Sequence, residues 1–403
     1  MKKTWKLFAL VMMVILSVTT VYASGRVDNT TSNGSAKKGS GNNTENAAQN
    51  TNKNSGKLYT ELPAGTDGTA GKSAKYVLFG EYPQTIMAQG VTINKSKSRQ
   101  QGEFTYYQGS DGAWYYEAEE HSFNYFEYDD AYLGIECLYS DGSERNIYDW
   151  DEPTTRFFKV EPIKWRVLTE NYQGKMLLIP EVILNAGIVY NENERIDRYA
   201  NDYEASTIRA YLNGTPYYSM SMTGLTADGP VFSETANDDY VGKGFLQTAF
   251  NADEQKAIAV TDVDNSLEQH FKHAEDGSVY IPSVIVEYRE SFGLDGMDTK
   301  DKVFLLSLNE IIEYMTEDEI GGIEATDFAL ANGAFYFSSW WLRSPLWCNL
   351  EETDDDIYYD SIIKVVYGSY MWGDESYGGY YSDYVDGAEY NDNCLVPVIC
   401  IEK

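Results

Sequence analysis

The chain offers few side chains in arrangements that support catalysis or metal binding. Of its three histidines, His270 and His273 have the i, i+3 spacing that can place two imidazoles on one helix face. Their surroundings are polar and lack cysteine, which favours a surface loop over a metal site. No Gly-x-Ser-x-Gly turn exposes a nucleophilic serine, and carboxylates are too frequent for pairs of them to single out a glycosidase site. We therefore expect no catalytic residues.

Two acidic clusters near the C-terminus are weak candidates for a calcium site. The candidate ligands are Asp354, Asp356, Asp360, Asn391 and Asp392. Calcium is bound by six to eight oxygen atoms from carboxylates, amides, carbonyls and water. Acidic runs are usually solvated surface, so we expect no cofactor and keep calcium as the weaker alternative.

The segment 347–393 has the composition of a recognition surface. It is rich in Tyr, Asp, Gly, Ser and Asn. Tyr and Trp give large contact areas with few rotatable bonds, small polar residues give adaptable hydrogen bonds, and aromatic residues dominate binding hot spots. The residues that we expect to contact a ligand are Trp347, Asn349, Tyr359, Tyr370, Trp372, Tyr377, Tyr380, Tyr381 and Tyr384. The alternative is an acidic surface loop of a β-rich domain.

Flanking residues are expected to hold this segment in place. The run Trp340–Pro345 precedes it, and the apolar run Leu395–Ile401 follows. Neighbouring residues of a strand point to opposite faces, so one of Trp340 and Trp341 should face inward. Arg343 should satisfy backbone or carboxylate groups.

The charge balance excludes two classes of partner. The chain has 63 Asp plus Glu against 31 Lys plus Arg, a formal net charge of -32. Nucleic acid and anionic lipid both require a basic surface. We expect no nucleic-acid partner, and contact with a membrane only through export or tethering. Hydrophobic residues make up 43% of the chain and aromatic residues 14%, and the 34 Tyr favour strands and binding surfaces.

The N-terminal residues predict export. Residues 1–23 resemble a signal peptide, with Lys2, Lys3 and Lys6, an apolar run and the cleavage-type sequence Val21–Ala23. Residues 24–75 are polar and small, which predicts a disordered linker. The folded domain is expected at 76–403. The location would be periplasmic, cell-surface or secreted.

Four cysteines occur in this exported context, which permits disulfides. Cys394 and Cys400 would lie about 20 Å apart on one extended strand, too far to bridge each other. Cys348 and Cys394 could close the base of the segment 347–393, although connectivity does not follow from sequence. Free buried thiols are the alternative.

The pattern along the domain predicts an α+β fold. Apolar runs indicate strands at 76–84, 157–168, 175–179 and 301–306. A helix is expected at 208–212, with Gly214 as its stop. Capping boxes starting at Asn251 and Ser307 predict two further helices. Short strands with a few short helices are typical of an α+β domain.

Five ordered motifs resemble an uncharacterised bacterial domain family over roughly residues 76–401. They are Phe79–Gln84, Ile163–Leu168, Ser206–Asn213, Asp301–Ser307 and Trp340–Pro345. The resemblance implies a C-type-lectin-like fold of the formylglycine-generating-enzyme type. It also implies kinship with the variable proteins of diversity-generating retroelements, whose C-terminal segment is rewritten by mutagenesis.

The chain departs from these relatives in two places. Val396 stands where family members carry Arg in a Gly-Val-Arg-Pro run, and no cysteine pair is placed for oxidase chemistry. We expect a secreted or surface-displayed module that binds a protein or glycan, with the segment 347–393 diversified in the manner of retroelement variable proteins. The alternatives are an exported enzyme on a formylglycine-generating-enzyme-like scaffold and a structural envelope protein without a specific ligand.

Overall fold

The computed structural model describes most of the region from Lys57 to the C-terminus. The described residues are 57–63, 65–66, 73–120, 138–145, 154–191, 202–226, 229–266, 297–316, 319–320, 323–334, 340–352, 357–366, 380–385 and 394–403. The predicted signal peptide lies outside them, as do His270 and His273. None of the helices in the described ranges is both long and apolar enough to span a membrane.

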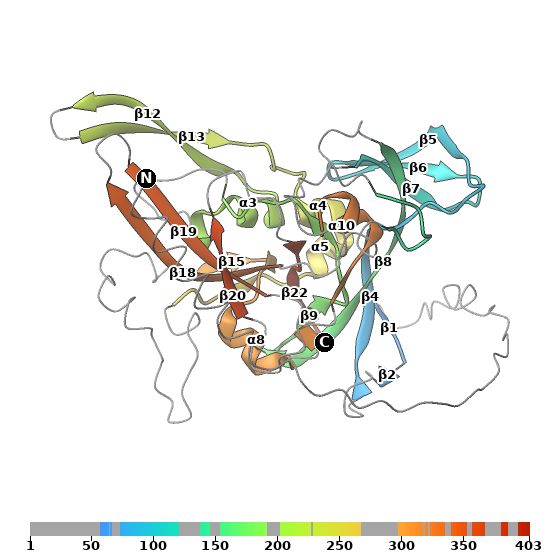
Figure 1. Ribbon diagram of the computed structural model, residues 1–403. Helices are drawn as coiled ribbons and strands as arrows, with labels where there is room; N and C mark the ends of the chain where they lie inside the picture. The colour runs from blue at the N-terminus through green and yellow to red at the C-terminus, as the bar shows by residue number, and fades with distance from the viewer. Residues whose placement is uncertain are drawn as a thin grey trace, which may run out of the picture. The chain divides into compact units, whose positions relative to one another are not determined.

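A nine-stranded antiparallel sheet organises the core (Figure 1). Its path runs β16-β22-β9-β8-β7-β6-β5, with β4 paired to β8 and β1 to β4. The strands are β1 (Thr60–Glu61), β4 (Tyr76–Ile86), β5 (Ile93–Gln101), β6 (Phe104–Gly109), β7 (Trp114–Glu119), β8 (Thr155–Tyr172), β9 (Lys175–Pro180), β16 (Val303–Phe304) and β22 (Val398–Ile401). The long strand β8 pairs with β4, β7 and β9 and so joins β5 and the aromatic strands β6 and β7 to the rest.

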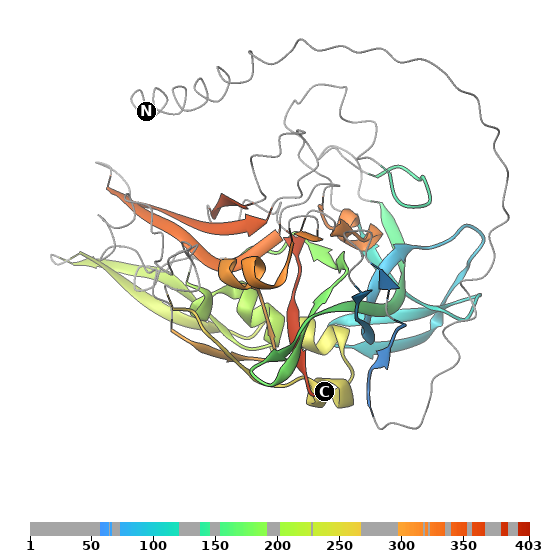
Figure 2. The same ribbon diagram turned by 90° about the horizontal axis from the view of Figure 1, so that it is seen from below.

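A five-stranded sheet carries the C-terminal strands, in the order β11-β21-β18-β19-β20. These strands are β11 (Asn185–Ala186), β18 (Trp340–Glu352), β19 (Ile357–Val366), β20 (Tyr380–Val385) and β21 (Cys394–Leu395). The turned view in Figure 2 shows β18 and β19 running side by side, as their antiparallel register requires.

Four two-stranded pairs complete the β-structure of the described residues. They are β2 (Gly65–Thr66) with β3 (Ser73–Ala74), β10 (Val182–Ile183) with β17 (Glu324–Ala325), β12 (Tyr217–Thr226) with β13 (Gly229–Asn237), and β14 (Thr261–Val263) with β15 (Thr299–Asp301). The strands β1, β2 and β3 lie within the predicted linker, so strand pairing begins before Tyr76.

The helices in the described ranges are short. They are η1 (Tyr203–Ala205), α3 (Thr207–Asn213), α4 (Phe245–Ala249), α5 (Ala252–Ala257), α8 (Leu308–Tyr314) and α10 (Asp327–Ala331). Both predicted capping boxes are confirmed, at the starts of α5 and α8. The predicted end of α3 is also confirmed, because Gly214 takes the left-handed conformation there.

The predicted α+β class is wrong, because the chain is mostly β. None of the helices named above exceeds seven residues, whereas strands supply the nine-stranded and five-stranded sheets. A capping box marks where a helix begins but carries no information on its length. The α+β class is therefore replaced by a sheet-rich class.

Residues before the segment 347–393 form part of the core. Trp340 and Trp341 are each only 1% exposed, so the expectation that one of them faces inward is corrected to both. The Trp341 indole donates a hydrogen bond to the Ile188 carbonyl at 2.8 Å. The predicted role of Arg343 is confirmed, because it donates to the Leu305 carbonyl and to both carboxylate oxygens of Glu310.

The described cysteines are buried. Cys394 lies on β21 and Cys400 on β22, in different sheets. Cys400 is a free thiol, in agreement with the prediction that it does not bridge Cys394, and burial raises its pKa to about 11. The side chain of Cys348 lies outside the described residues.

Candidate functional site

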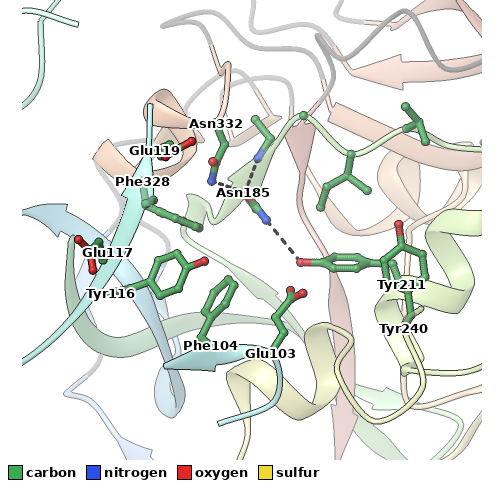
Figure 3. Close-up of a pocket in the computed structure, with 15 residues that line it drawn as sticks. Glu103, Phe104, Tyr116, Glu117, Glu119, Asn185, Tyr211, Tyr240, Phe328 and Asn332 are labelled. Carbon is green, nitrogen blue, oxygen red and sulfur yellow. Dashed lines mark hydrogen bonds between the residues drawn. The ribbon is translucent and has the colours of Figure 1, made fainter. Parts of the chain in front are cut away.

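A cavity of about 800 Å³ lies between the aromatic strands and the segment that follows β11. It is called the Asn185 cavity below. Strands β6 and β7 form one wall, and the segment 185–189, helix α3 and the end of α10 form the other (Figure 3). The described lining residues are Glu103, Phe104, Tyr116, Glu117, Ala118, Glu119, Asn185, Ala186, Gly187, Ile188, Val189, Tyr211, Tyr240, Phe328 and Asn332.

Three aromatic rings form a wall of the cavity. The register Tyr106↔Tyr116 sets β6 beside β7, and Phe104 stacks on Tyr116 with ring centroids 4.0 Å apart and planes at 26°. Phe328 of α10 meets both rings edge-on, at 6.0 Å from Phe104 and 5.6 Å from Tyr116. Such pairs stabilise one another beyond the area that they bury, so the wall is preorganised.

A network of amide and hydroxyl groups centres on Asn185. Its side-chain amide donates to the hydroxyls of Tyr82 at 3.2 Å and Tyr211 at 3.4 Å. Its carbonyl oxygen accepts from Asn332 Nδ2 at 2.8 Å and from the backbone N–H of Ala186 at 2.9 Å. Asn185 is thereby held in one orientation.

This network can present two donors to the cavity, depending on which of the Tyr82 and Tyr211 hydroxyls donates to the other. Tyr82 is fully buried, and its hydroxyl lies 3.4 Å from that of Tyr211. If Tyr82 donates to Tyr211, which already accepts from Asn185, the hydroxyl proton of Tyr211 is left over. An amide NH₂ carries two hydrogens, and the bond to Asn185 uses one of those on Asn332.

Gly187 allows the segment after β11 to approach the end of α10 closely. Its φ is +71°, and a Cβ atom there would lie 2.7 Å from the backbone oxygen of Asn332. Glycine adopts positive φ without steric cost and permits close approach of a second backbone. The segment after β11 can therefore lie against the end of α10.

Glu103 is the carboxylate that faces this network. It lies in the turn between β5 and β6, and Figure 3 shows its carboxylate pointing toward the Tyr211 hydroxyl. Although Glu103 remains exposed, neighbouring protein atoms displace part of its hydration and raise its pKa, while Lys243 acts in the opposite direction. The Tyr116 hydroxyl points into the same space.

Tyr116 and Tyr211 keep their hydroxyl protons at neutral pH and can donate hydrogen bonds. Burial raises the pKa of Tyr116 to about 12, and the charge of Glu103 adds to this. Burial also raises the pKa of Tyr211, again with a contribution from Glu103. A hydroxyl with a raised pKa keeps its proton, so it can donate a hydrogen bond but cannot act as a base.

The structure places six of the nine predicted contact residues on neighbouring strands. Trp347 and Asn349 lie on β18, Tyr359 lies on β19, and Tyr380, Tyr381 and Tyr384 lie on β20. The registers pair Leu350 with Tyr359 and Val365 with Tyr381. Tyr370, Trp372 and Tyr377 lie outside the described residues. None of the nine is among the described lining of the Asn185 cavity.

The calcium candidates are largely untested by the structure. Asp360 lies on β19, whereas Asp354, Asp356, Asn391 and Asp392 lie outside the described residues. Within the ranges that the structure describes, no group of three or more His, Cys, Asp or Glu is placed to hold a metal ion.

Sequence reasoning missed the residues of the Asn185 cavity. Tyr211 falls within the helix expected at 208–212, but no sequence pattern marks it or Tyr116 as a cavity residue. The hydrogen bond between Asn185 and Asn332 joins residues 147 positions apart. No local pattern signals a contact at that distance in the chain, so only a fold could reveal it.

Comparison with known proteins yields one family. No curated protein and no solved structure matches the chain, so the resemblance to C-type-lectin-like proteins, formylglycine-generating enzymes and retroelement variable proteins gains no support. A family model described as a domain of unknown function matches residues 173–374. This range includes Asn185, Tyr211 and Asn332 but not Glu103 or Tyr116. The expected membership of an uncharacterised domain family is thus confirmed: the chain belongs to the DUF6273 family, a domain of unknown function.

Proposed function

We propose that the protein is a ligand-binding module and that its Asn185 cavity receives part of a glycan. One observation carries the proposal: aromatic rings and preorganised polar groups converge on one cavity of about 800 Å³. Binding sites for small ligands have apolar walls with a few placed polar groups. A sugar ring presents C–H groups on its faces and hydroxyl groups at its rim. Its faces can pack against aromatic rings, and its rim can form hydrogen bonds with hydroxyl, amide and carboxylate groups.

The available contacts suit the two kinds of surface on a sugar. The rings of Phe104, Tyr116 and Phe328 can contact C–H faces. The hydroxyls of Tyr116 and Tyr211 and the second N–H of Asn332 can donate to sugar oxygens, and the Glu103 carboxylate can accept from sugar hydroxyls (Figure 3). Asn185 holds the donors of Tyr211 and Asn332 in position, so less freedom is lost on binding.

Binding is favoured over catalysis by the groups that the cavity presents. Its described lining contains no His, Cys, Ser or Lys. Glu117 is paired with Lys95 at 2.7 Å, and Figure 3 shows its carboxylate turned away from the cavity. Glu119 also lines the cavity at the end of β7, while Glu103 is the carboxylate that points toward the Tyr211 hydroxyl (Figure 3). Hydrolysis of a glycosidic bond ordinarily requires two carboxylates that flank the scissile bond, so a pair of Glu103 and Glu119 is the form that the enzyme alternative would take.

Export and surface display remain part of the proposal and rest on the sequence. A module tethered by the predicted linker would meet glycans outside the cytoplasm. The segment 347–393 would then supply a second contact surface. Its diversification in the manner of retroelement variable proteins is tested by genome context, because a neighbouring reverse transcriptase gene and a near-repeat of the codons for 349–393 are expected.

The test uses a glycan array followed by calorimetry on each hit. The Tyr116→Phe variant removes the hydroxyl and keeps the ring stack, and a lost hydrogen bond of about 1 kcal/mol predicts roughly fivefold weaker binding. The control is Tyr107→Phe, because Tyr107 lies on the neighbouring strand β6 and outside the cavity lining. Unchanged affinity in Tyr116→Phe for every hit would count against the cavity. Release of cleaved sugar would favour the enzyme alternative.

A further inference from the structure

The charged side chains that line the Asn185 cavity in the described part of the chain are all acidic. Its described lining includes Glu103, Glu117 and Glu119 and no Lys, Arg or His. Lys95 offsets the charge of Glu117. The chain as a whole carries a formal net charge of -32, which concentrates cations near its surface and repels anions. A ligand bearing a positive charge would therefore be drawn toward this cavity.

The position of Glu103 is fixed by the turn that carries it. Gly102 has φ +56°, and a Cβ atom there would lie 2.5 Å from Thr248 Oγ1. Gln101 donates to the Thr248 carbonyl at 2.7 Å. These contacts with α4 press the turn against the core, so the carboxylate of Glu103 is not free to leave the cavity by a movement of its backbone.

The surroundings of Glu103 supply little positive charge. The groups whose charges interact with it are Tyr82, Tyr106, Tyr116, Tyr211 and Lys243. The tyrosines are neutral, and Lys243 is exposed to solvent, which screens its charge. The carboxylate thus loses hydration without gaining a buried ion-pair partner among the residues that the structure describes.

The ring wall provides a second contact for a cation. Phe104 and Tyr116 stack, and Phe328 packs edge-on against them, so the three rings stand beside the carboxylate (Figure 3). An ammonium group within about 6 Å of a ring centroid is attracted by the ring's quadrupole, and the attraction grows when water is excluded. A carboxylate beside aromatic faces is a fitting environment for a protonated amine.

We propose that the glycan held by the Asn185 cavity carries a free ammonium group, which pairs with the Glu103 carboxylate against the Phe104 and Tyr116 rings. The ligand class is therefore an amino sugar with an unsubstituted amine. This inference rests on the proposed function and deepens it. Because Glu103, Phe104 and Tyr116 lie outside the matched range 173–374, the charge preference belongs to the part of this chain that precedes that range.

The experiment compares one oligosaccharide with and without its positive charges. Calorimetry on the full chain uses chitosan tetramer, whose amines are free, and the fully N-acetylated tetramer, at mildly acidic pH and low salt. We expect the free-amine tetramer to bind at least tenfold more tightly. Glu103→Gln should reduce binding of the free-amine tetramer by about tenfold and leave the acetylated one unchanged. Glu402→Gln is the matched control, since it removes an exposed charge outside the cavity lining.

The outcomes separate this inference from the proposed function. Equal affinity for the two tetramers, or a preference for free amine that survives in Glu103→Gln, would overturn the inference alone. The inference would also be overturned if every glycan bound on the array were neutral. An array without any hit would overturn the proposed function itself. If Glu103→Gln does not fold, the wild-type protein still decides, because a charge-based preference must shrink as salt is added and an unchanged preference would refute it.

Discussion

The buried ion pair between Arg343 and Glu310 offers a sharp test of how β18 is held. Arg343 is fully buried, and Glu310 is 5% exposed. The guanidinium donates to both carboxylate oxygens and also to the carbonyls of Leu305 at 2.7 Å and Asp264 at 3.1 Å. Tyr172 donates to the same carboxylate at 2.5 Å. The pair therefore joins β18 to α8 and, through Tyr172, to β8.

Replacing Arg343 by Met should cost about 3–5 kcal/mol of unfolding free energy. The change leaves the Glu310 carboxylate buried with only neutral donors, and breaking one side of a buried pair has a cost of that size. Removing both charges in Arg343→Met/Glu310→Gln should recover about 2 kcal/mol or more relative to the sum of the single changes, because no uncompensated charge remains. Urea unfolding followed by tryptophan fluorescence measures each free energy.

The pH dependence of the same pair has a definite sign. Burial by itself raises the pKa of Glu310, but Arg343 and Tyr172 outweigh it, and the folded pKa lies below its ordinary value of 4.5. The stabilisation is then complete above pH 4.5 and is lost as the pH falls from there through the folded pKa. The reasoning would be refuted if the losses of unfolding free energy in the two single variants added up to the loss in the double variant. It would also be refuted if Arg343→Met unfolded in acid over the same pH range as the wild-type protein.

Three further outcomes are expected. Gly187→Ala should cost about 1–3 kcal/mol of stability, because a Cβ at φ +71° meets the Asn332 carbonyl at 2.7 Å; calorimetry should also show weaker ligand binding. Asn251→Ala should lower stability by about 1 kcal/mol through loss of the α5 cap, with ligand affinity unchanged in the same assay. Tyr380→Ala with Tyr381→Ala should reduce capture on glycan and protein arrays while the melting temperature stays constant; full capture would argue against the C-terminal surface.

The sequence by itself determined the features that depend on near neighbours. The capping boxes at Asn251 and Ser307 need only residues three positions apart, and both form as predicted. Gly214 ends α3 because its backbone tolerates the left-handed conformation. Arg343 was expected to find carbonyl and carboxylate partners because a buried guanidinium requires them. These requirements hold whatever surrounds the element.

Only the tertiary structure decided the fold class and the candidate site. Trp340 and Trp341 are both buried because the strand that carries them is covered on both faces, which strand alternation cannot foresee. The Asn185 cavity gathers residues from the β5–β6 turn, β7, β11, α3 and the end of α10. Its chemistry arises from which distant segments meet, and that outcome reflects the packing of the whole core.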